Sequence, residues 1–127
     1  MTEGLAAAGV VAVACACASG DSRTADPNGI VVMGHSGATG YDSNPLNPEA
    51  DAPENSWATG DNPAVNSVYR RILARNPGIE GHAFNVARSG SDVNDLMRQA
   101  RIAVTTRPVP DLFVIQSVDN DLSLIHI

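Results

Sequence analysis

Positive charge is scarce in this sequence, which has eight arginines and no lysine against fourteen acidic residues and a formal net charge of −6. Proteins that bind nucleic acid carry clustered Lys and Arg, so this composition argues against a nucleic-acid partner. A phosphate-binding loop is excluded as well. The glycines at 34, 37 and 40 do not match the dinucleotide-binding pattern, and no lysine follows them.

Cysteine is also nearly absent, which excludes a disulfide-stabilised scaffold. Cys15 and Cys17 are the only two, and cysteines two residues apart do not easily bridge each other. The acidic residues are scattered, and the three histidines, at 35, 82 and 126, do not form a ligand cluster. We therefore expect no metal site and no cofactor.

No apolar run is long enough to cross a membrane. The run Leu5–Ala18 has fourteen uncharged residues and is followed by small ones, which is typical of a signal peptide at residues 1–20. Because Glu3 stands where a basic leader is expected, the alternatives are a start codon further upstream and a buried helix. A signal peptide predicts a secreted or cell-envelope protein. Val13-Ala14-Cys15 resembles a lipoprotein processing site, which predicts a lipid anchor through Cys15 or Cys17; otherwise both are small apolar residues of a discarded signal.

Residues 21–29 are polar, end in a turn-forming cluster and are expected to be a linker, so the folded domain should begin at Ile30. Three apolar segments are predicted to be buried strands, and two segments with helical periodicity are predicted to connect them. The order strand, helix, strand, helix, strand predicts an α/β fold with a parallel sheet and right-handed crossovers. The strands are expected at 30–33, 83–87 and 112–115; one helix should start at Asp61-Asn62-Pro63, and the other at a Ser91 cap.

Each predicted strand is followed by an unusual polar loop. These loops are Gly34–Gly40, Asn85–Ser91 and Gln116–Asp121. Ligand sites of open parallel sheets lie beyond the carboxyl ends of the strands, so the three loops should meet. Ser36 would present a hydroxyl on a tight glycine-flanked loop, as acyl transfer requires. The backbone N–H groups of Ser36 and Gly90 and the amide of Asn120 would bind the oxyanion, each donor contributing ~2.7–4 kcal/mol.

These three segments together resemble the SGNH (GDSL-type) serine hydrolase family. Gly34-His35-Ser36 resembles its Ser block, Asn85–Gly90 its Gly block and Asn120-Asp121 its Asn block. The wider stretch, Gly34–Asp42 with Glu54–Trp57, is similar to an actinobacterial branch of that family. The resemblance covers 30–121 and implies a flavodoxin-like three-layer α/β/α fold with strand order 2-1-3-4-5. It also implies a serine esterase or lipase that hydrolyses a small-molecule, lipid or glycan ester.

The sequence departs from the family pattern at His35, where the family has Asp, and at Val118, where it has Gly. Either departure leaves a second interpretation open, a non-catalytic cell-envelope binding module on the same fold. Taken singly, Ser36, Gly90 and Asn120 are also ordinary turn and capping residues, and only their combination favours catalysis. We expect His35 to brace the loop rather than to act as a base.

The family's general base comes from an Asp-x-x-His block, and no histidine here is preceded by Asp at that spacing. His82 lies before the second predicted strand, at the opposite end of the sheet from the site. Residues 122–127 can be back-translated to the end of a transposon adapter used in sequencing libraries. We therefore expect residues 30–121 to be a partial domain, truncated after its third strand, and residues 122–127 to be adapter read-through. On its own the chain should hydrolyse no ester above background.

Overall fold

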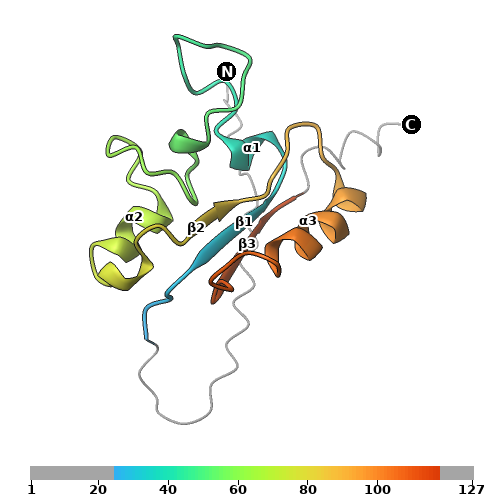
Figure 1. Ribbon diagram of the computed structural model, residues 1–127. Coiled ribbons are helices and arrows are strands. Elements are labelled where there is room, and N and C mark those ends of the chain that lie inside the picture. Colours follow the sequence, from blue (N-terminus) through green and yellow to red (C-terminus); the bar gives the residue numbers. More distant parts are fainter. Residues whose placement is uncertain (1–24, 118–127) are drawn as a thin grey trace, which may run out of the picture.

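The computed structural model describes residues 25–117, which form a three-stranded parallel sheet with short helices packed on it (Figure 1). The strands are β1 (Ile30–Gly34), β2 (Ala83–Asn85) and β3 (Leu112–Gln116), arranged in the order β2-β1-β3. The predicted α/β class, the parallel pairing and the alternation of strands with helices are confirmed. The signal peptide, Cys15, Cys17, Val118, Asn120 and residues 122–127 lie outside the described residues.

Strand β1 is the centre of the sheet, and all five of its residues are buried. Ile30 lies opposite Ala83 of β2 on one side and Leu112 of β3 on the other. A strand that is covered on both faces needs apolar residues at every position, which explains the unbroken run of apolar side chains in β1.

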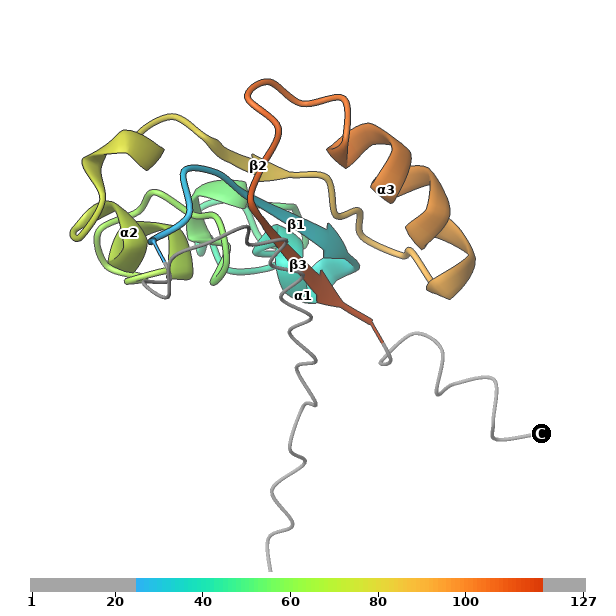
Figure 2. The same ribbon diagram turned by 90° about the horizontal axis from the view of Figure 1, so that it is seen from below.

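The two faces of β1 pack against different helices (Figure 2). Ile30 and Val32 lie in a cluster with α2 (Val68–Leu73), whereas Val31 and Met33 lie in a cluster with α3 (Leu96–Ala103). The short helix α1 (Ser36–Thr39) contributes Ala38 to the α2 side. The sheet is therefore covered by helices on both faces.

Helix α2 starts later than predicted. The segment Asp61-Asn62-Pro63 forms a turn, because Asn62 accepts hydrogen bonds from Ala64 N through its side chain and from Val65 N through its carbonyl. Asn66 then has φ = +50°, which no α-helix tolerates in its interior. The helix begins only after Ser67, whose Oγ accepts from Arg70 N at 3.2 Å. The 3₁₀ turn η2 (Pro77–Ile79) follows it.

Helix α3 also differs from its prediction, in its cap and in its buried face. Asp92 rather than Ser91 caps the preceding 3₁₀ turn η3 (Val93–Asp95), through a capping box with Asp95. The helical periodicity of this segment predicts an apolar stripe of Val93, Leu96, Met97, Ala100 and Val104. Leu96 and Ala100 pack on the sheet, but Val93, Met97 and Val104 are exposed. The helix instead buries Gln99 and Ala103. The sequence pattern fails here because a polar side chain occupies a core position.

Gly, Pro, Asn and Asp are frequent in residues 34–60, which predicts a long loop after β1, but this segment contains α1 and the 3₁₀ turn η1 (Pro53–Asn55). Part of the expected linker is also bound to the domain. Asn76 Nδ2 donates to the carbonyl oxygens of Asp26 and Pro27, and Asn28 N donates to Asp111 at 2.9 Å. Across residues 25–117, no helix is both long enough and apolar enough to cross a membrane.

Candidate functional site

Ser36 is the first residue of α1 and comes directly after a sharp turn at the end of β1. Gly34 makes this turn with φ = +141°, and a Cβ atom there would lie 2.0 Å from the backbone oxygen of Gln116. Only glycine fits such a position. His35 is 4% exposed, and its Nδ1 accepts from Gly37 N at 3.2 Å. His35 therefore caps α1, in keeping with the bracing role expected from the sequence.

Helix α1 is held in place by hydrogen bonds to the carbonyl of Ala38. This oxygen accepts from Ser56 Oγ at 2.7 Å and from Asn85 Nδ2 at 2.8 Å. Asn85 is the last residue of β2, and its Oδ1 also accepts from Ala87 N at 3.1 Å. The end of β2 therefore holds both the helix that begins at Ser36 and the start of its own following loop.

The second predicted loop lies against the first. Arg88 N donates to Gly34 O at 3.1 Å, and Ser89 Oγ lies 3.3 Å from Thr39 Oγ1. Asp51 joins them, because its Oδ1 accepts hydrogen bonds from both Ser89 and Thr39. Directly after these contacts, Gly90 has φ = +81° and is exposed, with no atom within 4 Å of the position of a Cβ.

The start of the third predicted loop reaches the same place. The three loops pack closely around a small crevice that leaves no room for a water molecule, lined by residues of all three loops and of α3: Gly34, His35, Ser91, Asp92, Leu96, Gln116 and Ser117. Gln116 lies beside Gly37, and its Oε1 accepts from Trp57 Nε1 at 2.9 Å. Trp57 is half-buried on the core, so its indole braces the site, whereas Tyr41 is 44% exposed.

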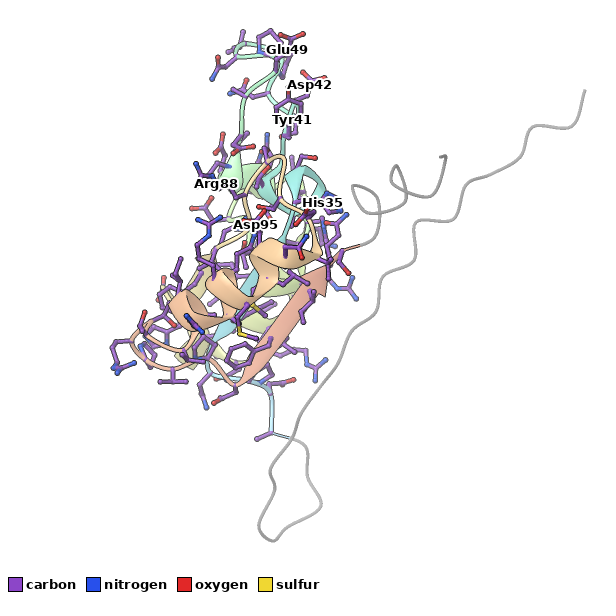
Figure 3. All side chains as sticks on the ribbon, turned by 90° about the vertical axis from the view of Figure 1, so that its right-hand side faces the viewer. His35, Tyr41, Asp42, Glu49, Arg88 and Asp95 are labelled. Atoms are coloured by element: carbon purple, nitrogen blue, oxygen red, sulfur yellow. The ribbon has the colours of Figure 1, made fainter. Side chains whose placement is uncertain are left out.

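The loop after α1 projects beyond the rest of the domain (Figure 3). Tyr41, Asp42 and Glu49 lie on this projection, and their side chains face solvent. Asp42 holds it in shape, because its N–H donates to Ala50 O and its carboxylate accepts from Glu49 N at 3.0 Å. The projecting loop thus presents two exposed carboxylates to solvent.

One basic residue of the second loop lies near a carboxylate. Arg88 and Asp95 lie at the base of the projecting loop (Figure 3). The hydrogen bond from Arg98 and the backbone N–H of Asp92 hold the pKa of Asp95 below its ordinary value; burial opposes them, and the charges of Arg98 and Arg88 add smaller effects in the lowering direction. The hydrogen bond from Arg98 is the main cause of this lowered pKa, and Arg88 contributes least.

The structure thus brings together the loops that carry Ser36 and Gly90, and Asn120 lies outside the described residues. Sequence reasoning missed three side chains that connect these loops: Asp51, Asn85 and Gln99. Asn85 stood inside the Gly block and was identifiable there as a polar residue at a strand end. Asp51 and Gln99 had no signal, because their contacts join segments far apart in the sequence.

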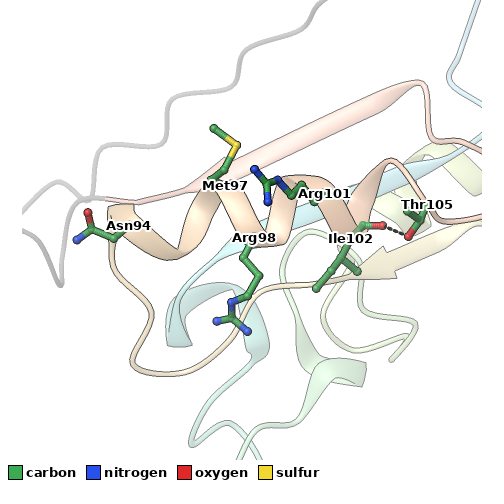
Figure 4. Close-up of a pocket in the computed structure, with 6 residues that line it drawn as sticks. All are labelled: Asn94, Met97, Arg98, Arg101, Ile102 and Thr105. Atoms are coloured by element: carbon green, nitrogen blue, oxygen red, sulfur yellow. Dashed lines mark hydrogen bonds between the residues drawn. The ribbon is translucent and has the colours of Figure 1, made fainter.

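A larger depression, of about 490 Å³, lies along the outer surface of α3 (Figure 4). Its lining comes from α3 and the residues flanking it: Asn94, Met97, Arg98, Arg101, Ile102 and Thr105. None of these residues belongs to the three strand-end loops, and the depression is open to solvent. This depression is therefore separate from the loops around Ser36, where the packing is close.

Searches against protein families, curated proteins and solved structures find no match for this sequence.

Proposed function

We propose that this chain carries the nucleophile and part of the oxyanion hole of an SGNH-type serine carboxylic-ester hydrolase with a flavodoxin-like α/β/α fold. The observation that carries the proposal is the meeting of the strand-end loops around the Ser36 turn. The carbonyl of Gly34 accepts from Arg88 N, and the backbone of Gly34 approaches Gln116 so closely that a side chain is excluded. Parallel α/β sheets place their ligand sites at this end of the strands.

In the proposed reaction, Ser36 Oγ attacks the carbonyl carbon of an ester and the alcohol leaves, giving an acyl-enzyme that water then hydrolyses. The N–H groups of Ser36 and Gly90 and the amide of Asn120 would stabilise the oxyanion formed in each step. Ser36 Oγ has no hydrogen-bond partner among residues 25–117, so it is free to take up a substrate-dependent orientation.

The reaction also needs a general base, and the described histidines do not meet the requirement. His35 uses Nδ1 to cap α1, and His82 lies before β2 with its Nδ1 3.0 Å from Asn28 O. These positions are at opposite ends of the sheet. We propose that the base is a histidine of an Asp-x-x-His block encoded beyond residue 121 of the natural gene. An extended gene lacking that block would favour a binding module.

The test is to compare the 127-residue chain with the product of the full genomic reading frame on a p-nitrophenyl ester. We expect hydrolysis by the longer protein alone, and a loss of at least about 10³-fold in Ser36→Ala. Ser43→Ala, in the projecting loop, is the matched control and should retain activity. Full activity of Ser36→Ala would disprove the proposal, and Ser36-dependent activity of the short chain would disprove its dependence on a distant base.

We also propose that residues 1–20 export the protein, either as a cleaved signal or as a lipoprotein signal. Fusing these residues to a periplasmic reporter tests export, and Cys15→Ser and Cys17→Ser test lipidation. Retention of the reporter in the cytoplasm would contradict export.

A further inference from the structure

Gln99 is a buried polar residue of α3 whose side chain ends at the turn before Ser36. It is 2% exposed, and its whole amide group is hydrogen-bonded. Oε1 accepts from Gly34 N at 2.6 Å, and Nε2 donates to Gly34 O at 2.9 Å and to Ser91 Oγ at 3.1 Å. A glutamine amide has two N–H donors and one carbonyl acceptor, so both donors and the oxygen are in use.

These three bonds join the two loops that the proposed reaction needs to hold together. Gly34 lies two residues before Ser36, and Ser91 directly follows Gly90. The carbonyl of Gly34 also accepts a hydrogen bond from Arg88 N. Arg88 precedes Gly90 in the sequence, whereas Ser91 follows it. The side chain of Gln99 in α3 thus contacts both the first loop and the second loop.

Other hydrogen bonds between the two loops lie before Gly90. They come from Asn85 to Ala38, from Arg88 N to Gly34, and from Ser89 through Thr39 and Asp51. After Gly90, the bond from Gln99 joins Ser91 Oγ to the same amide group that holds Gly34. The orientation of the Gly90 N–H therefore depends on the contacts of Arg88 and Ser89 before it and on the contact of Ser91 after it.

We infer that Gln99 is a positioning residue that sets the distance and angle between Ser36 and the Gly90 N–H. The inference rests on the proposed function. Oxyanion donors act only when they are held where charge develops, and a misplacement of about 1 Å can cost about 10²-fold in rate. A side chain that only filled space would not need three hydrogen bonds to two loops.

The decisive variants are made in the full-length protein. Gln99→Met keeps the length and volume of the side chain and removes all three bonds. Ser91→Ala removes the bond at one end and leaves the amide on Gly34, so it reports on the arrangement even if Gln99→Met does not fold. Ala103→Gly is the matched control, because Ala103 is a fully buried residue of the same helix that lies in the apolar cluster with Val31 and Met33 and makes no side-chain hydrogen bond.

We expect kcat to fall about 10²-fold in Gln99→Met and about tenfold in Ser91→Ala, with KM changed by less than about threefold in both. Ala103→Gly should lower the melting temperature and leave kcat within about twofold. Equal kcat losses in Ala103→Gly and Gln99→Met at matched melting temperature would overturn the inference, as would unchanged kcat in folded Gln99→Met.

The failure of the proposed function has a different signature. It appears in the wild-type protein, as an absence of Ser36-dependent hydrolysis. In that case, amide hydrogen exchange at Gly34 and Arg88 still tests whether Gln99 holds the two loops together. Faster exchange at both residues in Gln99→Met, with Ala103→Gly unchanged, supports Gln99 as the link between the loops, and unchanged exchange in Gln99→Met overturns it.

Discussion

Gln116 of β3 occupies the space that a side chain on Gly37 would need. A Cβ atom on Gly37 would lie 2.2 Å from Gln116 Nε2. The orientation of this amide is fixed by Trp57, because an indole N–H only donates and therefore must face Oε1. Glycine next to Ser36 thus allows β3, α1 and the long loop to meet at one point.

Gly37→Ala should break the hydrogen bond between Trp57 and Gln116 with little change in stability. The new methyl group displaces the end of a flexible side chain, which costs a hydrogen bond of ~1 kcal/mol. The gain in helix propensity on replacing Gly by Ala offsets this by up to ~1 kcal/mol. We expect the indole N–H resonance of Trp57 to shift while the free energy of unfolding changes by less than ~1 kcal/mol. An unshifted resonance would contradict the packing described here.

Gly34→Ala should be far more damaging. The Cβ atom would meet the backbone oxygen of Gln116, which cannot move without disturbing the pairing of β1 with β3, and a positive φ itself costs ~1–3 kcal/mol. We expect a loss of at least ~3 kcal/mol in denaturant unfolding. Gly81→Ala is the control, since Gly81 has φ = +76° but no atom within 4 Å of the Cβ position, and it should cost only ~1 kcal/mol. Equal losses in the two variants would show that the clash is unimportant.

Asp51→Ala should loosen the second loop from α1. The variant removes the carboxylate that accepts from Thr39 at 2.6 Å and from Ser89. Because Asp51 is exposed, we expect a loss at the low end for charged hydrogen bonds, ~1–2 kcal/mol in total, and a smaller loss in Asp51→Asn, which keeps one acceptor oxygen. Thermal or denaturant unfolding measures both. Asp61→Ala, an exposed aspartate of the same long segment, should stay within ~0.5 kcal/mol of wild type.

Arg98→Met should raise the pKa of Asp95 toward its ordinary value. Arg98 Nη2 lies 2.8 Å from Asp95 Oδ1, and this hydrogen bond is the largest cause of the lowered pKa. A lowered carboxylate pKa stabilises the fold above the ordinary value of an aspartate, and that contribution is lost as pH falls through the folded-state value. Carboxyl NMR titration measures the change, and added salt should reduce it. Arg101→Met, on the same helix, should leave the pKa of Asp95 unchanged.

The framework of the fold could be predicted from local patterns, since β1 and β3 are largely apolar runs bounded by turn residues. Strand β2 ends at Asn85, two residues before its predicted end, because the Asn85 side chain bonds Ala38 and Ala87. The errors arose where one side chain changed the outcome. Asn62-Pro63 is a typical helix start, yet the left-handed conformation of Asn66 delays α2 until Ser67 provides a better cap. The buried face of α3 was misplaced because glutamine is usually exposed, and Gln99 becomes buried only by bonding Gly34.

The site could be predicted in outline for a related reason. The rule that parallel strands end at the same edge is enough to bring the loops of Ser36 and Gly90 together. The hydrogen bonds that hold those loops could not be predicted, because Asp51 and Trp57 lie in a segment without periodicity. Their partners are 12 and 59 residues away in the sequence, and no local pattern records such contacts.

The central place of β1 has a consequence for synthesis of the protein on the ribosome. Ile30 emerges early, but its partner Leu112 is made almost at the end of the described region. Until then, the most apolar strand of the domain has an unpaired edge. Long-range parallel pairing is slow to form and exposes such edges to other chains. Nascent chains stalled before residue 112 should therefore recruit chaperones or aggregate, whereas chains that have extruded β3 should not.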